Sequence, residues 1–323
     1  MVMAQSLFRL LREQQPDVEI DVVGPPWSIP LVARMPEVRR GVPLAVAHGD
    51  LGLGARWALG RSLRQAGYGR AIVIPRSFKS ALVPWVAGIP VRTGFGAEGR
   101  SILLNDVRRL DRRVLDQTVK RLVALGLPPG TNPPVPLPAS LHPVLRVDEG
   151  NRAALLSRLG LGQRPAIALM PGAAYGPAKQ WPVEAFAELA RRLGTQGFEA
   201  WILGSAAEQP LGGQISAASD AHVYNLCGQT GLSDTVDLLS VTKAAVTNDS
   251  GLMHVAAAAG TRVVAIYGSS SPHFTPPLTA EKAILHLALD CSPCFRRECP
   301  LGHLNCLRQI SPASVLAAMN LEA

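Results

Sequence analysis

The chain has 323 residues, of which 47% are hydrophobic and 17% are charged. This composition is typical of a globular protein with a large core and excludes a disordered chain, while the length allows two domains of ordinary size. Lys and Arg number 32 against 24 Asp and Glu, which gives a formal net charge of +8, so we expect an acidic partner.

The basic residues do not form a nucleic-acid-binding pattern. They are spread along the chain, without zinc-finger spacing or an aromatic RNA-binding motif. No run of about 18 apolar residues predicts a transmembrane helix, and residues 1–6 lack the basic region and cleavage site of a signal peptide. We therefore expect a cytoplasmic protein without a nucleic-acid partner. Doublets of basic residues are typical of solvated helix faces; here they are Arg39-Arg40, Arg108-Arg109, Arg112-Arg113, Arg191-Arg192 and Arg296-Arg297.

The N-terminal half predicts alternating helices and strands. Apolar residues recur with helical spacing over residues 1–15, and a short apolar run at 18–24 predicts a strand. The same patterns predict helices at 30–35, 52–67 and 78–88 and strands at 70–75 and 91–95. This alternation is typical of a parallel α/β domain, which normally opens with a central strand that is missing here.

A proline-rich segment follows the first half. Seven prolines lie between positions 128 and 143, too many for a helix or a central strand. We interpret this segment as a connection between domains, and predict an N-terminal domain at 1–145 and a C-terminal domain at 146–323. In the second domain the patterns predict helices at 151–159, 182–193 and 232–242 and strands at 165–170 and 198–204.

The most informative stretch is Thr247-Asn-Asp-Ser-Gly-Leu-Met-His254. It joins a predicted strand at 243–247 to a predicted helix at 252–259, and another strand follows at 261–268. A polar turn at the carboxyl end of a parallel strand is where open α/β sheets bind ligands, and a helix N-terminus favours an anion. The alternative is structural, because Asp249 or Ser250 can simply cap the helix.

Other strand ends carry further candidates. Lys179 lies in the loop after the strand at 165–170; the loop is not a Walker A motif, but the lysine can neutralise a phosphate as a point charge. Glu208 follows the next strand and suits ribose hydroxyl groups. Each has a plain alternative as a solvated surface residue, and His254 faces either a ligand or the core.

Taken together, the motifs resemble glycosyltransferase family 9, the heptosyltransferases. The resemblance lies in Pro171-Gly-Ala-Ala-Tyr-Gly-Pro-Ala-Lys-Gln-Trp-Pro182, in the 247–254 stretch and in 267–276. Residues 77–84, 88–94 and 103–108 resemble the same family, so nearly the whole chain is covered. The resemblance implies an α/β fold of the GT-B type: two Rossmann-like domains with parallel sheets facing a central cleft.

The resemblance also implies an activity. Such an enzyme moves heptose from ADP-L-glycero-D-manno-heptose to the inner-core heptose of lipopolysaccharide with inversion of the anomeric centre and without a metal in the active site. It would be peripheral at the anionic inner face of the inner membrane. Two alternatives stay open: the acceptor specificity of heptosyltransferase I, and a catalytically silent ADP-sugar-binding or nucleotide-binding protein.

Site residues follow by position from the resemblance. The catalytic candidates are Lys179, which would stabilise the leaving diphosphate, and Asp249, which suits sugar hydroxyls or turn amides better than phosphate because like charges repel. The C-terminal domain would hold the donor and the N-terminal domain the acceptor. The full donor-binding set is Lys179, Glu208, Gly228, Thr230, Asp249, Ser250, Gly251 and His254, and the acceptor-binding set is Lys79, Arg92 and Arg108.

One family feature is absent from this sequence. Family members begin with an apolar strand that ends in Gly-Asp, and that aspartate is thought to be the base that deprotonates the acceptor hydroxyl. Here neither precedes the predicted helix at 1–15. We expect the natural start to lie upstream of Met1, because loss of a central strand would expose two strand edges and part of the core. This chain would then lack its base, and reading the codons upstream of Met1 tests this.

Four of the five cysteines form a cluster near the C-terminus. In a cytoplasmic protein, a C-x2-C pair followed by two further cysteines suggests structural zinc rather than disulfides. The spacing is tight and is not that of a standard zinc finger. The predicted ligands are Cys291, Cys294, Cys299 and Cys306, whereas Cys227 is predicted to be a buried residue at a strand end.

Overall fold

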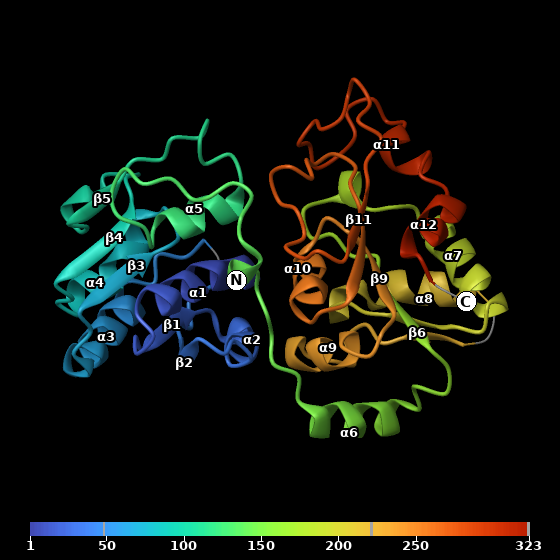
Figure 1. Ribbon diagram of the computed structural model, residues 1–323, viewed down its shortest axis with the longest axis horizontal. Coiled ribbons are helices and arrows are strands. Elements are labelled where there is room, and N and C mark those ends of the chain that lie inside the picture. Colours follow the sequence, from blue (N-terminus) through green and yellow to red (C-terminus); the bar gives the residue numbers. More distant parts are fainter. Residues whose placement is uncertain (48, 220–221, 322–323) are drawn as a thin grey trace. The chain divides into compact units, whose positions relative to one another are not determined.

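The structure, a computed structural model, describes residues 1–47, 49–219 and 222–321. It divides into two compact units, Met3–His142 (unit 1) and Pro143–Ala323 (unit 2) (Figure 1). The predicted boundary lies at 145/146, at the end of the same proline-rich segment. Within the described ranges, no helix combines the length and the hydropathy needed to span a membrane.

Unit 1 contains two separate parallel sheets. One pairs β1 with β2, and the other has the order β3-β4-β5. Among the described residues, β1 pairs with β2 alone and β3 pairs with β4 alone. The strands are β1 (Ile20–Gly24), β2 (Val38–Pro43), β3 (Arg70–Val73), β4 (Val91–Phe95) and β5 (Asp106–Arg108), and the helices are α1 (Gln5–Gln14), α2 (Ile29–Val32), α3 (Leu53–Leu63), α4 (Leu82–Val86) and α5 (Thr118–Ala124).

Strand β2 was not predicted, and its arginines explain why. Arg39 and Arg40 give it a polar pattern, but both donate hydrogen bonds to the buried carboxylate of Asp21 in β1. Burial by itself would raise the pKa of Asp21, but hydrogen bonds from Arg39, Tyr68 and Arg40 hold that pKa well below its usual value. The expectation that the doublets lie on helix faces is therefore wrong here. Of the five doublets, only Arg191-Arg192 lies in a helix.

Unit 2 is built on one parallel sheet of six strands. Its order is β11-β10-β9-β6-β7-β8. Numbered from the first strand of the unit, this is the doubly wound order of a Rossmann fold, as predicted. The strands are β6 (Ala166–Met170), β7 (Glu199–Ile202), β8 (Val223–Asn225), β9 (Ala244–Asn248), β10 (Arg262–Ile266) and β11 (Lys282–Leu285).

Helices cover both faces of this sheet (Figure 1). On one face α7, α8 and α12 pack together, and on the other α6, α9 and α10 do so. A parallel sheet needs this double cover, since both of its faces are apolar. The helices are α6 (Glu149–Leu159), α7 (Val183–Thr195), α8 (Gln209–Ala217), α9 (Leu232–Leu239), α10 (Gly251–Ala258), α11 (Asn305–Arg308) and α12 (Pro312–Met319).

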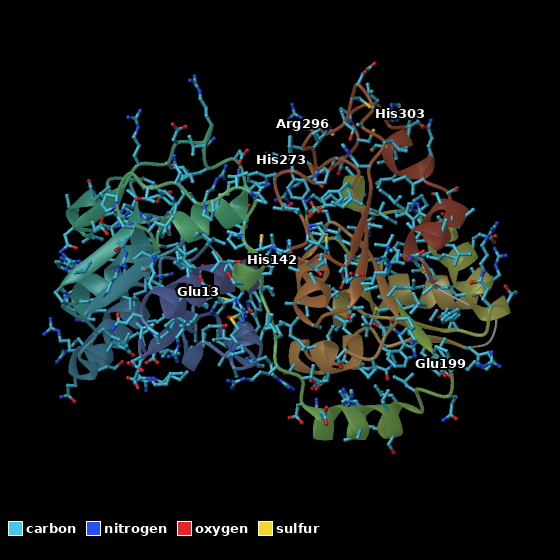
Figure 2. All side chains as sticks on the ribbon, in the orientation of Figure 1. Glu13, His142, Glu199, His273, Arg296 and His303 are labelled. Atoms are coloured by element: carbon cyan, nitrogen blue, oxygen red, sulfur yellow. The ribbon has the colours of Figure 1, made fainter. Side chains whose placement is uncertain are left out.

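One charged residue lies inside unit 2. The Glu199 side chain of β7, labelled in Figure 2, is fully buried. Its carboxylate accepts hydrogen bonds from the Gly162 and Gln163 amides at 3.1 Å and from Trp201 Nε1 at 2.8 Å. A buried carboxylate with all of these donors is satisfied, so Glu199 has a structural role.

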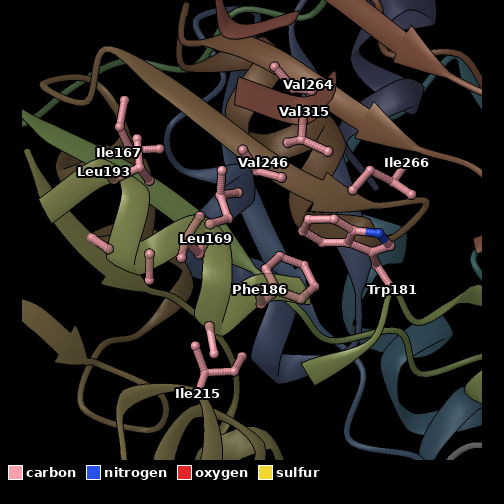
Figure 3. Packing of buried hydrophobic residues seen from close by; sticks show 14 of the residues in the cluster. Ile167, Leu169, Trp181, Phe186, Leu193, Ile215, Val246, Val264, Ile266 and Val315 are labelled. Atoms are coloured by element: carbon pink, nitrogen blue, oxygen red, sulfur yellow. The ribbon is translucent and has the colours of Figure 1, made fainter. Parts of the chain in front are cut away.

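The main core lies between the sheet and helices α7, α8 and α12 (Figure 3). Residues two apart on a strand share a face, so alternate residues of β6, β9 and β10 all point to this side. Each buried aliphatic or aromatic side chain contributes about 1.5–3 kcal/mol relative to exposure. This packing fixes the strand ends that carry the site. The core includes Ile167, Leu169, Val246, Val264 and Ile266 of the strands and Phe186, Leu193, Ile215 and Val315 of the helices.

Candidate functional site

Strands β6 and β9 are neighbours at the point where the strand order reverses. The chain leaves β6 towards α7 on one face of the sheet and leaves β9 towards α10 on the other. The two connections therefore diverge and leave a crevice beyond the carboxyl ends of the strands, which is where doubly wound sheets bind ligands. The loops at 171–182 and 248–251, both singled out from the sequence, border this crevice.

Asn248 joins the two loops. Its Nδ2 donates to the carbonyl oxygen of Pro171 at 2.7 Å, and its Oδ1 accepts from the Trp181 amide at 3.0 Å. The side chain is fully buried. Trp181 Nε1 in turn donates to the carbonyl oxygen of Ile310 at 3.0 Å. Both ends of the 171–181 loop are therefore held in place. This role of Asn248 was not predicted; its signal in the sequence is a polar amide side chain at the end of a buried strand.

Lys179 and Asp249, the predicted catalytic residues, meet in the crevice. Lys179 Nζ lies 2.5 Å from Asp249 Oδ2, and the side chains are 17% and 6% exposed. Thr275 Oγ1 donates to the other carboxylate oxygen at 3.3 Å. Because the carboxylate is engaged with Lys179, Asp249 positions the lysine rather than capping α10.

The N-terminus of α10 has no side-chain cap. Ser250 occupies the N-cap position, but no side chain accepts from the first amides there. The structural alternative of a capped helix is therefore wrong. A Cβ atom added at Gly251 would meet nothing within 4 Å, so the space beside the first turn is open. The first amides of α10 and the helix dipole favour an anion at this end of the helix.

His254 lies one turn into α10 and is neutral near pH 7. Burial lowers the pKa of its imidazole to about 4, with a smaller contribution from Lys179, while Asp249 opposes the shift.

Four buried polar atoms around the crevice have no hydrogen-bond partner within the part of the chain that the structure describes. They are Thr230 Oγ1, His254 Nδ1, Ser269 Oγ and Ser270 Oγ.

Glu208 lies against the loop that follows β6. Its carboxylate accepts from the Ser205 amide at 2.6 Å and from Ser205 Oγ at 2.9 Å. A Cβ atom at Gly172 would come within 1.5 Å of Glu208 Oε1, so any larger residue there would displace the Glu208 side chain. Gly228 has a φ of +75°, and a Cβ atom on it would come within 2.9 Å of the Ala206 backbone. The predicted nucleoside residues therefore border the same crevice.

The predicted acceptor residues of unit 1 already have partners. Lys79 Nζ donates to the carbonyl oxygens of Gly49 and Asp50 at 2.8 and 2.6 Å. Arg92 donates to two backbone carbonyls, and Arg108 pairs with Asp106 at 2.7 Å. Through these hydrogen bonds, the three residues connect loops and strands of unit 1.

Arg108 also borders a basic hollow of about 450 Å³. It opens beyond the carboxyl ends of β3, β4 and β5, and its lining contains no carboxylate from the described residues. Arg76, Arg109 and Arg112 make no hydrogen bond or ion pair with any described residue. This cluster was not predicted, because its members come together only through the parallel strand ends. The lining is Arg76, Gly96, Val107, Arg108, Arg109, Leu110 and Arg112.

The four clustered cysteines are free thiols. Burial raises the pKa of Cys306, and so do the nearby Cys291, Cys299 and Cys294. Backbone amides at 301–304 donate to the Cys299 sulfur and lower its pKa. In the described ranges, however, no three His, Cys, Asp or Glu side chains lie so that they could hold a metal ion. The zinc site predicted from the spacing therefore stays a prediction. Cys227 is buried after β8, as predicted.

Comparisons with known proteins agree with this geometry. The model of glycosyltransferase family 9 (heptosyltransferase) matches residues 56–305. The chain is 44% identical to lipopolysaccharide heptosyltransferase 2 of Escherichia coli K12, over 99% of this chain and 94% of the relative. A solved structure of E. coli ADP-heptose lps heptosyltransferase II is similar with a TM-score of 0.88 and 42% identity, over 99% and 94% of the two chains.

A more distant structure supports the fold alone. The glycosyl transferase family 9 protein from Veillonella parvula matches with a TM-score of 0.81 and 21% identity, over 98% of this chain and 92% of that one. The predicted α/β class of the GT-B type is therefore confirmed. The matched residues include both loops of the crevice and the strand ends around the basic hollow.

Proposed function

The chain belongs to glycosyltransferase family 9, the heptosyltransferases, and on that premise we propose that it moves heptose from ADP-L-glycero-D-manno-heptose to the inner-core heptose of lipopolysaccharide. The observation that carries the proposal is the position of Lys179 in the same crevice as the open N-terminus of α10. The names of the similar proteins support this substrate pair. The place of action would be the cytoplasm.

The donor diphosphate would bind at the first turn of α10. Ser250 and Gly251 leave that turn open, and its amides would donate to phosphate oxygens. Asp249 would hold Lys179 and accept from heptose hydroxyls, since its own charge repels phosphate. The nucleoside would lie beside Glu208, Gly228 and Thr230. His254, which is neutral, would offer Nδ1 to the donor without adding charge.

Catalysis would come mainly from stabilising the departing ADP. The acceptor hydroxyl oxygen bonds to C1 of heptose as the bond from C1 to the diphosphate oxygen breaks, and the configuration inverts. The negative charge that develops on ADP falls beside Lys179 and the α10 amides, which are already fixed in place. According to the family resemblance, an aspartate at the end of a first strand would be the base that accepts the proton of the acceptor hydroxyl. This mechanism uses no metal.

The acceptor would bind unit 1 through its anionic groups. Lys79, Arg92 and Arg108 have internal partners, so we place the anionic groups of the acceptor in the basic hollow, with Arg108 on its wall. Arg109 and Arg112 lack partners among the described residues and can pair with phosphates or carboxylates in a planar, two-point manner.

A matched pair of arginines tests the acceptor site. Arg112→Gln should raise the KM for the acceptor about tenfold and leave the KM for ADP-heptose unchanged. Arg113→Gln removes the same charge from the adjacent residue, which does not line the hollow, and should behave like the unmodified enzyme. Equal acceptor KM values for the two variants would contradict this assignment.

Contact with an anionic membrane face would use an apolar patch on unit 1. Leu51, Leu53, Trp57 and Trp85 are 64, 56, 52 and 43% exposed, and the two indole rings are 6.4 Å apart. Arg61 lies beside them and suits anionic head groups. Exposed tryptophans with a nearby cation are typical of membrane interfaces.

Vesicle sedimentation tests this contact. Trp57→Ser should weaken binding to vesicles that contain phosphatidylglycerol several-fold. Trp27→Ser is the control, because Trp27 is 66% exposed elsewhere on unit 1. If both variants bind the vesicles as the unmodified protein does, the patch is not the contact.

The acceptor specificity is tested with two lipids. Incubated with ADP-heptose, the protein should add one heptose to heptosyl-Kdo2-lipid A and none to Kdo2-lipid A, as followed by mass spectrometry. Comparison with a version extended upstream of Met1 tests the expected base. Transfer to Kdo2-lipid A instead would indicate the specificity of heptosyltransferase I, and ADP binding without transfer in either form would indicate a silent binding protein.

A further inference from the structure

The proposed diphosphate site is short of positive charge. Lys179 carries one positive charge, but it forms an ion pair of 2.5 Å with Asp249, so the two together are neutral. A diphosphate brings at least two negative charges, and such groups are normally held by several charge-assisted hydrogen bonds. The α10 amides supply part of this attraction. A further cation near Lys179 would supply the rest.

Arg297 lies in the right place to be that cation. Lys179 Nζ is 5.0 Å from the centre of the Tyr175 ring, and Arg297 Cζ is 5.5 Å from the same centre. Both distances are within the range of a cation–π contact. One ring therefore contacts both cations, and an anion bound beside Lys179 would also attract Arg297.

Backbone contacts fix Arg297 beside the donor loop. The Ala178 amide donates to the carbonyl oxygen of Arg297 at 3.0 Å. A Cβ atom on Gly176 would lie 2.6 Å from that same oxygen, so the close approach requires glycine at 176. Tyr175 Oη donates to the carbonyl oxygen of Phe295 at 2.7 Å. The position of Arg297 thus depends on the loop that also carries Lys179.

The cysteine segment, residues 291–306, is anchored to a second loop of the crevice as well. The Phe295 amide donates to the carbonyl oxygen of Ser269 at 2.6 Å, and Ser292 Oγ donates to that of Gly268 at 2.6 Å. Arg296 and His303 mark the segment in Figure 2. It therefore connects the loops that follow β6 and β10 and carries Arg297 between its second and third cysteines.

The Arg297 guanidinium is free to bind a ligand. Its side chain is exposed, and within the described ranges it makes no hydrogen bond or ion pair; its contact is with the Tyr175 ring. An arginine that is oriented by stacking and lacks an acidic partner keeps all of its donors available.

We infer that Arg297 is a second phosphate-binding residue of the donor site and that it pairs with the diphosphate together with Lys179. The inference rests on the proposed function, because it places the ADP diphosphate beside α10. It also gives the cysteine segment a role, since the segment carries this cation to the crevice.

Calorimetric titration with ADP and with adenosine tests the inference. Arg297→Gln should weaken ADP binding about tenfold and leave adenosine binding unchanged, because only ADP carries the diphosphate. Arg297→Lys keeps the charge but not the planar guanidinium group, so this variant should lose less ADP affinity than Arg297→Gln. Arg296→Gln is the matched control: it removes the same charge from the neighbouring exposed residue, and its ADP affinity should equal that of the unmodified protein.

Three results would overturn the inference. Equal ADP affinities of Arg297→Gln and Arg296→Gln would show that Arg297 does not meet the phosphates. Equal losses of ADP and adenosine affinity in Arg297→Gln would show that the residue only supports the fold of the loop. If the unmodified protein binds no ADP, both the inference and the proposed donor fail, whereas the first two results leave the proposed donor intact.

Discussion

The ion pair between Lys179 and Asp249 allows a quantitative prediction. Removing one partner of a buried pair costs about 3–5 kcal/mol because a charge is left buried, whereas surface pairs contribute about 0–1 kcal/mol. Here the side chains are 17% and 6% exposed, so the pair lies between these cases. Asp249→Ala should lower the free energy of unfolding by about 2 kcal/mol, since the lysine left behind can still reach water.

Lys179→Met should cost more, about 3 kcal/mol, because it leaves the less exposed carboxylate with only the Thr275 hydroxyl. The double variant should then lose about 2 kcal/mol less than the two single variants predict additively. Urea unfolding of all four proteins measures this coupling. The pair of Arg192 and Glu188 on α7, at 2.7 Å but far more exposed, is the control and should show a much smaller coupling. Equal coupling at both pairs would refute the reasoning.

Two further predictions concern pH and metals. Burial lowers the pKa of His254 to about 4, so protonation of this histidine favours the unfolded state. The free energy of unfolding should therefore fall by roughly 3 kcal/mol as the pH decreases from about 6.5, the usual pKa of histidine, to 4. His254→Gln should flatten the curve of unfolding free energy against pH over this range, and parallel curves would contradict the pKa assignment. Because Lys179, Arg297 and the α10 amides provide the positive charge, heptose transfer should survive treatment with EDTA within about twofold; a loss that Mg²⁺ or Mn²⁺ restores would count against this mechanism.

The central strands of unit 2 were predictable because their residues are buried on both faces. Strands β6, β9 and β10 are short and consist mainly of Ala, Val, Ile and Leu, and such segments indicate strands buried in a parallel sheet. Strands β8 and β11 lie at the edges of the sheet and are only partly buried. Their mixed sequences lack that signal, and they were missed.

The candidate site was predictable where single residues stand at strand ends. Lys179, Glu208 and Asp249 were found in this way, because the carboxyl ends of parallel strands meet at one edge of the sheet. What joins them was not predictable. The bonds of Asn248 to Pro171 and Trp181 span 77 and 67 positions. Contacts over such separations follow from the three-dimensional fold and leave no local pattern in the sequence.

The zinc site expected at the cysteine cluster stays a prediction. The spacing suggested a metal site, but spacing alone does not determine where the sulfur atoms point. In the structure, the amides at 301–304 engage Cys299, and Cys306 is buried at the start of α11. What the segment does bring to the crevice is Arg297, a residue that the sequence analysis counted only among the basic doublets.

The central claim is that the crevice of Lys179 and the α10 N-terminus transfers heptose. The most direct measurement is the rate at which ADP-heptose and heptosyl-Kdo2-lipid A yield a product one heptose heavier, for the unmodified protein and for Lys179→Met. Loss of a fixed group that stabilises transition-state charge costs about 10²–10³ in rate, so the variant should be slower by that factor while its product is the same. Equal rates for the two proteins would contradict the account.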